Sequence, residues 1–109
     1  MKTAIYVRVS TTQQIDRESL QTQEERLRQY CKAHGHSIYK VYREEGVSAK
    51  DIKRPRLEQL MQDIENGRID AVLVTKLDRI TRSLKDLINL IEFFQEHDIK
   101  LISLTQNID

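Results

Sequence analysis

The chain has 109 residues, 39% of them hydrophobic, which is enough for one small domain with a modest core and too little for a second domain. Its 18 Lys and Arg residues almost balance its 17 Asp and Glu residues, so the net charge of +1 does not indicate a nucleic-acid-binding protein, and any basic site must be local. The single cysteine, Cys31, excludes an internal disulfide and a cysteine-rich zinc site, and the lack of a long apolar run or a signal-peptide pattern favours a cytoplasmic protein.

Strand-like and amphipathic helical segments alternate along the chain. In order, the pattern predicts a strand over 3–9, a helix over about 19–34, a strand over 37–44, a helix from Pro55 to Asn66, a strand over 70–77, a helix over about 83–97 and a strand over 99–104. Gly35 is placed to end the first helix in a left-handed conformation, and Pro55 is a favoured first-turn residue. This alternation predicts an α/β fold with a mostly parallel sheet of four or more strands, helices on both faces and right-handed crossovers.

Polar side chains gather at one edge of the predicted sheet. Ligands of such sheets bind outside the carboxyl ends of the strands. The segments that follow the first three strands there supply a serine, three arginines and a carboxylate: Ser10, Arg54, Asp78, Arg79 and Arg82. Arg79 and Arg82 are three residues apart in what should be the first turn of a helix, so they should share a side, and guanidinium groups suit phosphate oxygens.

An arginine inside the first strand needs a partner. Alternation places Arg8 with Tyr6 and Ser10 on the face opposite Ile5 and Val7, and helices should cover both faces of the sheet. One interpretation is that Arg8 lies in an edge strand, reaches solvent or pairs with a structural carboxylate. The company of Arg79 and Arg82 favours the other interpretation, in which Arg8 joins these arginines in binding an anion.

Gln23 is a second polar residue in an apolar setting. It lies three residues after Leu20 and four before Leu27, on the helix stripe that should face the sheet. Either the border of the stripe passes through this position, or the amide of Gln23 bonds a buried backbone group.

Four segments in chain order resemble the signature segments of the catalytic domain of serine recombinases, the resolvase/invertase and large serine integrase family. They read YVRVSTTQQ (6–14), SLQTQEERL (19–27), EGVSAKDIKRPRLEQL (45–60) and VTKLDRITRS (74–83). The resemblance spans nearly the whole chain, and four ordered segments are far more specific than one. The stretch 30–48 is more similar to the large-integrase or transposon-recombinase branch than to the small resolvases.

The resemblance implies a DNA strand-exchange enzyme with a resolvase-like catalytic fold. Ser10 would be the nucleophile that attacks a phosphodiester, forms a 5′-phosphoserine linkage and releases a 3′-hydroxyl. Further residues would hold the scissile phosphate (Arg8, Arg79, Arg82 and Arg54), orient an arginine or assist proton transfer (Asp78), form a supporting polar shell (Tyr6, Gln23 and Ser48) and pack beneath it (Leu77). Because the bond energy is conserved in the linkage, no ATP or other cofactor is implied.

The histidines do not offer a general base for the serine. His34, His36 and His97 all lie away from the strand exits, so a Ser-His-Asp triad is not expected, and their spacing gives no metal site. Guanidinium groups around the serine could lower its pKa instead, which leaves the general base unassigned.

The resemblance also implies that residues 1–109 are the N-terminal catalytic domain of a longer recombinase, ending before a long oligomerisation helix and DNA-binding domains. The implied partners are DNA and, in the full-length protein, further copies in a dimer or tetramer, without a membrane or a small-molecule substrate. The implied location is the bacterial cytoplasm, in association with the nucleoid, for a bacterial or phage-encoded protein. An alternative is a non-catalytic phosphate-binding or oligomerisation module of the same fold, which would tolerate Ser10→Ala.

Overall fold

The computed structural model describes residues 1–9, 19–45, 54–81 and 83–105. Its elements follow in the order β1 (Lys2–Val9), α1 (Leu20–His34), β2 (Ser37–Glu45), α2 (Pro55–Glu65), β3 (Ala71–Val74), a short 3-10 helix η1 (Leu77–Arg79), α3 (Leu84–Glu96) and β4 (Lys100–Ser103). None of the helices in these ranges is long and apolar enough to cross a membrane.

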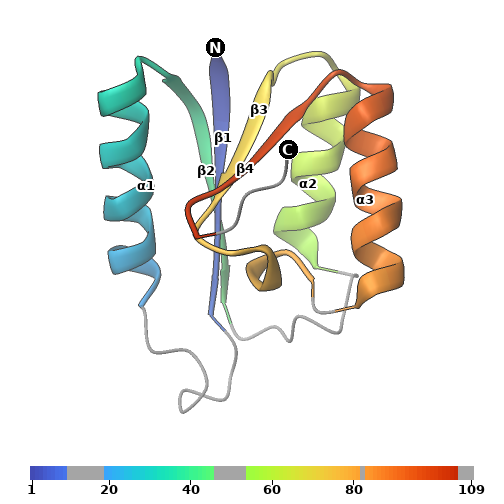
Figure 1. The fold of residues 1–109 in the computed structure, drawn as a ribbon, viewed down its shortest axis with the longest axis horizontal. Coiled ribbons are helices and arrows are strands. Elements are labelled where there is room, and N and C mark those ends of the chain that lie inside the picture. Colours follow the sequence, from blue (N-terminus) through green and yellow to red (C-terminus); the bar gives the residue numbers. More distant parts are fainter. Residues whose placement is uncertain (10–18, 46–53, 82, 106–109) are drawn as a thin grey trace.

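The described strands form one parallel sheet with the order β2-β1-β3-β4. Figure 1 shows α1 on one side of this sheet and α2 and α3 on the other, with the chain running down β1 from the N-terminus. The predicted α/β class, the parallel pairing and the helices on both faces are therefore confirmed. The helices cover both faces because each carries one apolar stripe that can leave water only by packing on the sheet.

Side chains of β1 alternate between the two halves of the core. Ala4 and Tyr6 lie in the cluster formed with α2 and α3, whereas Ile5 and Val7 pack with Leu27 and Cys31 of α1. This confirms the predicted alternation in the first strand, and it makes β1 a central strand that is covered on both faces. The suggestion that this strand is an edge of the sheet is wrong.

Local signals in the sequence fix the helix ends. Gly35 adopts a left-handed conformation, with φ of 71°, and its amide donates to the carbonyl of Cys31, as expected for a C-terminal cap. Ser19 caps the start of α1 by accepting from the amide of Thr22 at 3.1 Å. Pro55 is the first residue of α2.

The segment after β3 departs from the prediction. The strand ends at Val74 rather than at residue 77, and Arg79 lies in η1 instead of the first turn of α3, which begins at Leu84. The hydroxyl of Ser83 accepts from the amide of Asp86 at 3.3 Å and so sets the start of α3. The segment before this cap is consequently a separate turn at the sheet edge.

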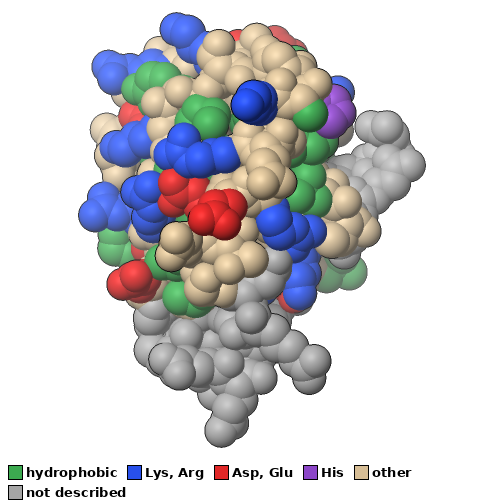
Figure 2. All heavy atoms as spheres, turned by 90° about the vertical axis from the view of Figure 1, so that its left-hand side faces the viewer, with side chains coloured by type: hydrophobic (Ala, Val, Ile, Leu, Met, Phe, Trp, Pro, Cys, Tyr) green, Lys and Arg blue, Asp and Glu red, His purple; other side chains and the backbone are tan. Residues whose placement is uncertain are grey.

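Charged side chains of both signs cover the outer face of α1. Figure 2 looks onto this helix and shows basic and acidic groups interspersed over it. On α1 the carboxylate of Glu24 pairs with Arg28 at 2.8 Å and with Arg43 of β2 at 2.7 Å. The pair with Arg43 links the surface of α1 to the edge strand β2.

Candidate active site at the ends of β1 and β3

The strand order reverses direction at β1. The chain places β2 on one side of β1 and β3 on the other, so the carboxyl ends of β1 and β3 form the point at which ligands of such sheets bind. Arg8 lies near the end of β1, and η1 follows β3 at the same edge (Figure 1). Segments 70 residues apart in the sequence therefore meet here.

Arg8 and Arg79 hold each other through their main chains. The Nε of Arg8 donates to the carbonyl of Arg79 at 3.0 Å, and its Nη2 donates to the carbonyl of Asp78 at 3.1 Å. In return, Nη1 of Arg79 donates to the carbonyl of Arg8 at 3.4 Å. Both arginines are at most 3% exposed. The buried guanidinium of Arg8 is thus docked on η1, so the suggestion that it reaches solvent is wrong.

Gln23 fixes the backbone at the end of β1. Its Oε1 accepts from the amide of Arg8 at 3.3 Å, and its Nε2 donates to the carbonyl of Arg8 at 3.0 Å. The pairing of β1 with β3 has already ended at Ile5, so the side-chain amide acts like a short piece of neighbouring strand. Gln23 is fully buried, which confirms that its amide bonds a buried backbone group and excludes the border of the helix stripe.

Arg54 joins this arrangement from the start of α2. It is fully buried, and its Nη1 donates to the carbonyl of Arg79 at 3.1 Å. Its guanidinium also lies over the ring of Tyr6, 5.6 Å from the centroid, which is within the range of a cation–π contact. The carbonyl of Arg79 therefore accepts from both Arg8 and Arg54, so the side chains of two arginines converge on the short turn that carries a third.

Tyr6 connects Arg54 to a buried carboxylate. The hydroxyl of Tyr6 donates to Oε1 of Glu44 at 3.3 Å. Burial raises the pKa of the Tyr6 hydroxyl well above its ordinary value, with the nearby Glu44 carboxylate adding to the effect and Arg54 opposing it. Tyr6 therefore stays neutral and acts as a donor at physiological pH.

Sequence reasoning missed Glu44. The signal that could have found it is its place in β2, two residues after the buried Tyr42, so that both point to the same face of the sheet. A second signal is that Arg54-Pro55 offers no side chain typical of a helix N-cap, so the cap of α2 had to come from elsewhere.

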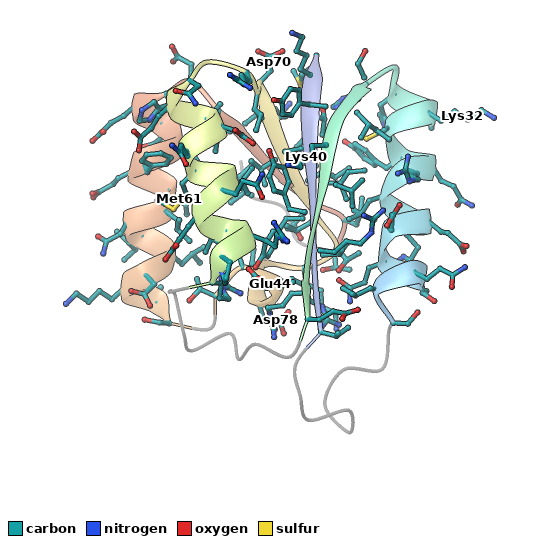
Figure 3. The ribbon with its side chains drawn as sticks, turned by 180° about the vertical axis from the view of Figure 1, so that it is seen from behind. Lys32, Lys40, Glu44, Met61, Asp70 and Asp78 are labelled. Atoms are coloured by element: carbon teal, nitrogen blue, oxygen red, sulfur yellow. The ribbon has the colours of Figure 1, made fainter. Side chains whose placement is uncertain are left out.

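Asp78 lies at the same edge. Its carbonyl accepts from Arg8, and within the described residues its buried Oδ1 has no hydrogen-bond partner. Figure 3 shows Asp78 and Glu44 close to this end of the sheet, near the start of α2. Leu77, the first residue of η1, is half-buried, and its carbonyl accepts from the amides of Ile80 and Thr81 at 3.0 and 3.2 Å.

Three predicted site residues, Ser10, Ser48 and Arg82, lie outside the described residues. The structure thus brings together Arg8, Arg54 and Arg79 with a supporting shell of Tyr6 and Gln23. Guanidinium groups stay charged at any physiological pH and bind phosphate oxygens in a planar geometry, so this edge of the sheet is suited to an anionic phosphate ligand.

Histidines are remote from this edge in the described part of the chain. His36 contacts Thr3 at the opposite end of β1, with 2.8 Å between Nδ1 and Oγ1, and His34 and His97 contact carbonyls of their own helices. Within the same ranges no group of three or more His, Cys, Asp and Glu side chains is placed to hold a metal ion. At this edge the described residues bring together the guanidinium groups of Arg8, Arg54 and Arg79, which can contact an anionic ligand.

Comparisons with known proteins agree on one family. The family model described as "Resolvase, N terminal domain" matches residues 3–109. The transposon Tn917 resolvase of Enterococcus faecalis is 38% identical over 104 residues, which are 95% of this chain and 50% of that protein. The transposon Tn552 resolvase of Staphylococcus aureus is 33% identical over 94% of this chain and 46% of its own length. The chain thus spans about half the length of the curated resolvases that it matches.

Solved catalytic domains share both the fold and part of the sequence. The N-terminal catalytic domain of TP901-1 integrase superposes with a TM-score of 0.88 at 40% identity, over 96% of this chain and 78% of that one. The C-terminal catalytic domain of ISC1926 TnpA, an IS607-like serine recombinase, gives a TM-score of 0.85 at 29% identity, over 95% and 70% of the two chains. The similarity thus includes an integrase and an IS607-like serine recombinase as well as the resolvases, and these comparisons do not separate the branches of the family.

Proposed function

This chain belongs to the resolvase N-terminal-domain family, and from that premise we propose that it is the catalytic domain of a site-specific DNA recombinase. The observation that carries the proposal is that Arg8 and Arg54 converge on Arg79 in the turn after β3, at the strand ends where ligands of such sheets bind. The relatives' names, which include resolvase, DNA-invertase and integrase, supply the substrate class.

The proposed chemistry uses Ser10 as the nucleophile. Its hydroxyl oxygen forms a bond to the phosphorus of a DNA phosphodiester while the bond from phosphorus to the 3′ oxygen breaks, and the serine proton is balanced by the proton that the 3′-hydroxyl takes up. Attack of another 3′-hydroxyl on the phosphoserine reverses the step and rejoins DNA. One phosphoester bond replaces another throughout, so the proposal requires no nucleotide or other cofactor.

The arginines supply the electrostatic part of the proposed mechanism. Arg8, Arg79 and Arg82 hold the scissile phosphate, and Arg54 adds a further contact from the start of α2. Phosphoryl transfer is catalysed mainly by positioning and by stabilising charge on the phosphate oxygens. The bonds from Arg8 and Arg54 to the carbonyl of Arg79 support this role, because they hold these side chains in place before a ligand arrives. Asp78 orients an arginine or assists proton transfer in this proposal.

The whole protein's partners belong to the proposal as well. Because the curated resolvases are about twice as long as the matched region, we assign recognition of the DNA site, and assembly into a dimer or tetramer, to parts outside residues 1–109. The proposed location is with bacterial or phage DNA in the cytoplasm.

A covalent trapping assay tests the nucleophile. DNA duplexes that bind the parent protein are first selected from a random pool. The selected duplexes are nicked near the bound site and incubated with the parent protein, and the covalent adduct is mapped by mass spectrometry. The expected result is a phosphoserine link at Ser10 that Ser10→Ala abolishes while DNA binding stays nearly intact. Ser37→Ala, at an exposed serine where β2 begins, is the matched control and keeps the adduct. Strand exchange by Ser10→Ala would instead favour a different nucleophile, and a wild-type protein that binds DNA but forms no adduct would favour the non-catalytic module.

A further inference from the structure

Helix α2 begins without a cap of its own. The N-cap residue Arg54 makes no side-chain capping bond, and Pro55 at the first position has no amide hydrogen. The next two amides, of Arg56 and Leu57, donate to the carboxylate of Glu44, which lies on β2. The distances from Arg56 to Oε1 and Oε2 are 3.2 and 3.3 Å, and the distance from Leu57 to Oε1 is 3.2 Å.

The carboxylate of Glu44 is buried among donors that compensate its charge. Glu44 is only 3% exposed, and besides the two helix amides it accepts the hydroxyl of Tyr6. A negative group at the first turn of a helix is also stabilised by the helix dipole. Glu44 therefore caps α2 from the preceding strand, 12 residues before Arg56, and this cap explains how an acidic side chain is tolerated in the interior.

The first turn of α2 and the side chain of Tyr6, both bonded to Glu44, also set the position of Arg54. Arg54 directly precedes the first turn of α2. Because Glu44 holds the amides of Arg56 and Leu57 in that turn, it also fixes the backbone position from which the side chain of Arg54 extends. The ring of Tyr6, whose hydroxyl bonds Glu44, lies under the guanidinium of Arg54. The far end of the same guanidinium reaches the carbonyl of Arg79.

We propose that Glu44 is a positioning residue for Arg54: through the first turn of α2 and the ring of Tyr6, its carboxylate holds the Arg54 guanidinium at the site formed by Arg8 and Arg79. The effect on catalysis rests on the proposed recombinase function. The placement of Arg54 does not, so it can be measured separately. Glutamine at position 44 would keep the volume, but an NH2 group would replace one of the two acceptors. In the place of Oε2 it would face the amide of Arg56, and in the place of Oε1 it would also lose the bonds from Leu57 and Tyr6, so at least one capping bond must be lost.

The placement of Arg54 is tested by NMR of the isotope-labelled protein. Glu44→Gln is compared with Glu58→Gln, which removes an exposed acidic charge from the same first turn of α2 without touching the cap. In Glu44→Gln the amides of Arg56 and Leu57 are expected to exchange with solvent about tenfold faster, as for loss of a helix cap.

The Nε–H signal of Arg54 is expected to shift and broaden in Glu44→Gln and to stay unchanged in Glu58→Gln. Retained amide protection together with an unchanged Arg54 signal in Glu44→Gln would overturn the proposal. The remaining amide signals of the spectrum show whether each variant is folded.

A double-mutant cycle on DNA cleavage tests the catalytic consequence. Glu44→Gln is expected to slow single-turnover cleavage on the order of 10²-fold, the size of effect that a small misplacement of a catalytic group produces. In an Arg54→Ala background the same substitution is expected to slow cleavage by no more than about twofold, because the group that it positions is already gone.

The outcomes separate the two proposals. Equal losses in both backgrounds would show that Glu44 acts on stability or on another residue, and would overturn its role through Arg54. Cleavage by Arg54→Ala at the wild-type rate, or no cleavage by the wild type, would count against the proposed function of Arg54 or of the chain. In that case the NMR comparison still decides whether Glu44 positions Arg54.

Discussion

Replacing Gln23 by methionine tests whether the end of β1 depends on a side chain of α1. Methionine has nearly the same length and volume, so the substitution leaves little cavity and mainly removes the two bonds to the amide and carbonyl of Arg8. Each bond contributes about 1 kcal/mol, and a buried amide that loses its partner costs about 1–3 kcal/mol.

The expected destabilisation of Gln23→Met is therefore about 2–4 kcal/mol. For a domain of about 100 residues this lowers Tm by roughly 10–20 °C, a large share of the stability of a small protein. Equilibrium urea unfolding followed by circular dichroism measures the free energy of unfolding directly. The slope against urea should stay unchanged, because the surface exposed on unfolding is the same.

The matched control is Gln21→Met, the same substitution two residues earlier on the exposed side of α1. Gln21 makes an exposed bond to Glu25 at 3.4 Å, so its replacement should change the free energy of unfolding by no more than about 0.5 kcal/mol. A Gln23→Met variant that is as stable as this control would refute the inference that Gln23 stands in for a neighbouring strand.

Two further predictions concern ionisable groups. The bond from Arg43, and then that from Arg28, lowers the pKa of the Glu24 carboxyl, so wild type should exceed Glu24→Gln in stability near neutral pH, and the difference should vanish as the pH falls through the lowered pKa. Both arginine partners are about half exposed, so the difference should stay below about 1 kcal/mol and shrink in 1 M salt. Urea unfolding between pH 2 and 7 measures the difference, and a difference that grows toward acid would contradict this prediction. Burial raises the pKa of the Cys31 thiol, so iodoacetamide at pH 8 should modify it only as fast as the protein opens, and modification at the rate of unfolded protein would refute its burial.

Much of the fold could be predicted because its signals are local. The apolar spacing in each helix, the left-handed Gly35 and the first-turn Pro55 all act within a few residues, and they gave element ends within one or two residues of those observed. The alternation in β1 also placed Tyr6 on the face away from Ile5 and Val7, as observed.

The sequence pattern predicted the turn after β3 less well. Arg79 was expected in a helix, but it lies in η1, and the carbonyls of Asp78 and Arg79 accept from the guanidinium of Arg8. These two bonds join residues that are 71 and 70 positions apart in the sequence, so the spacing of residues within a helix or strand could not predict them. The long reach of an arginine side chain let tertiary contacts shape a segment that has weak local preferences.

By itself, the sequence determined the alternation of strands and helices, the two faces of β1 and the edge of the sheet at which Arg54 and Arg79 lie. Only the tertiary structure decided how those arginines are held, with Arg8 and Arg54 on the carbonyl of Arg79, Gln23 on the backbone of Arg8 and Glu44 capping α2 from β2. The physical reason is the range of the forces involved. Burial and backbone propensity follow from neighbours in the chain, whereas a buried charge or amide must find its partner wherever the fold brings one within hydrogen-bond distance.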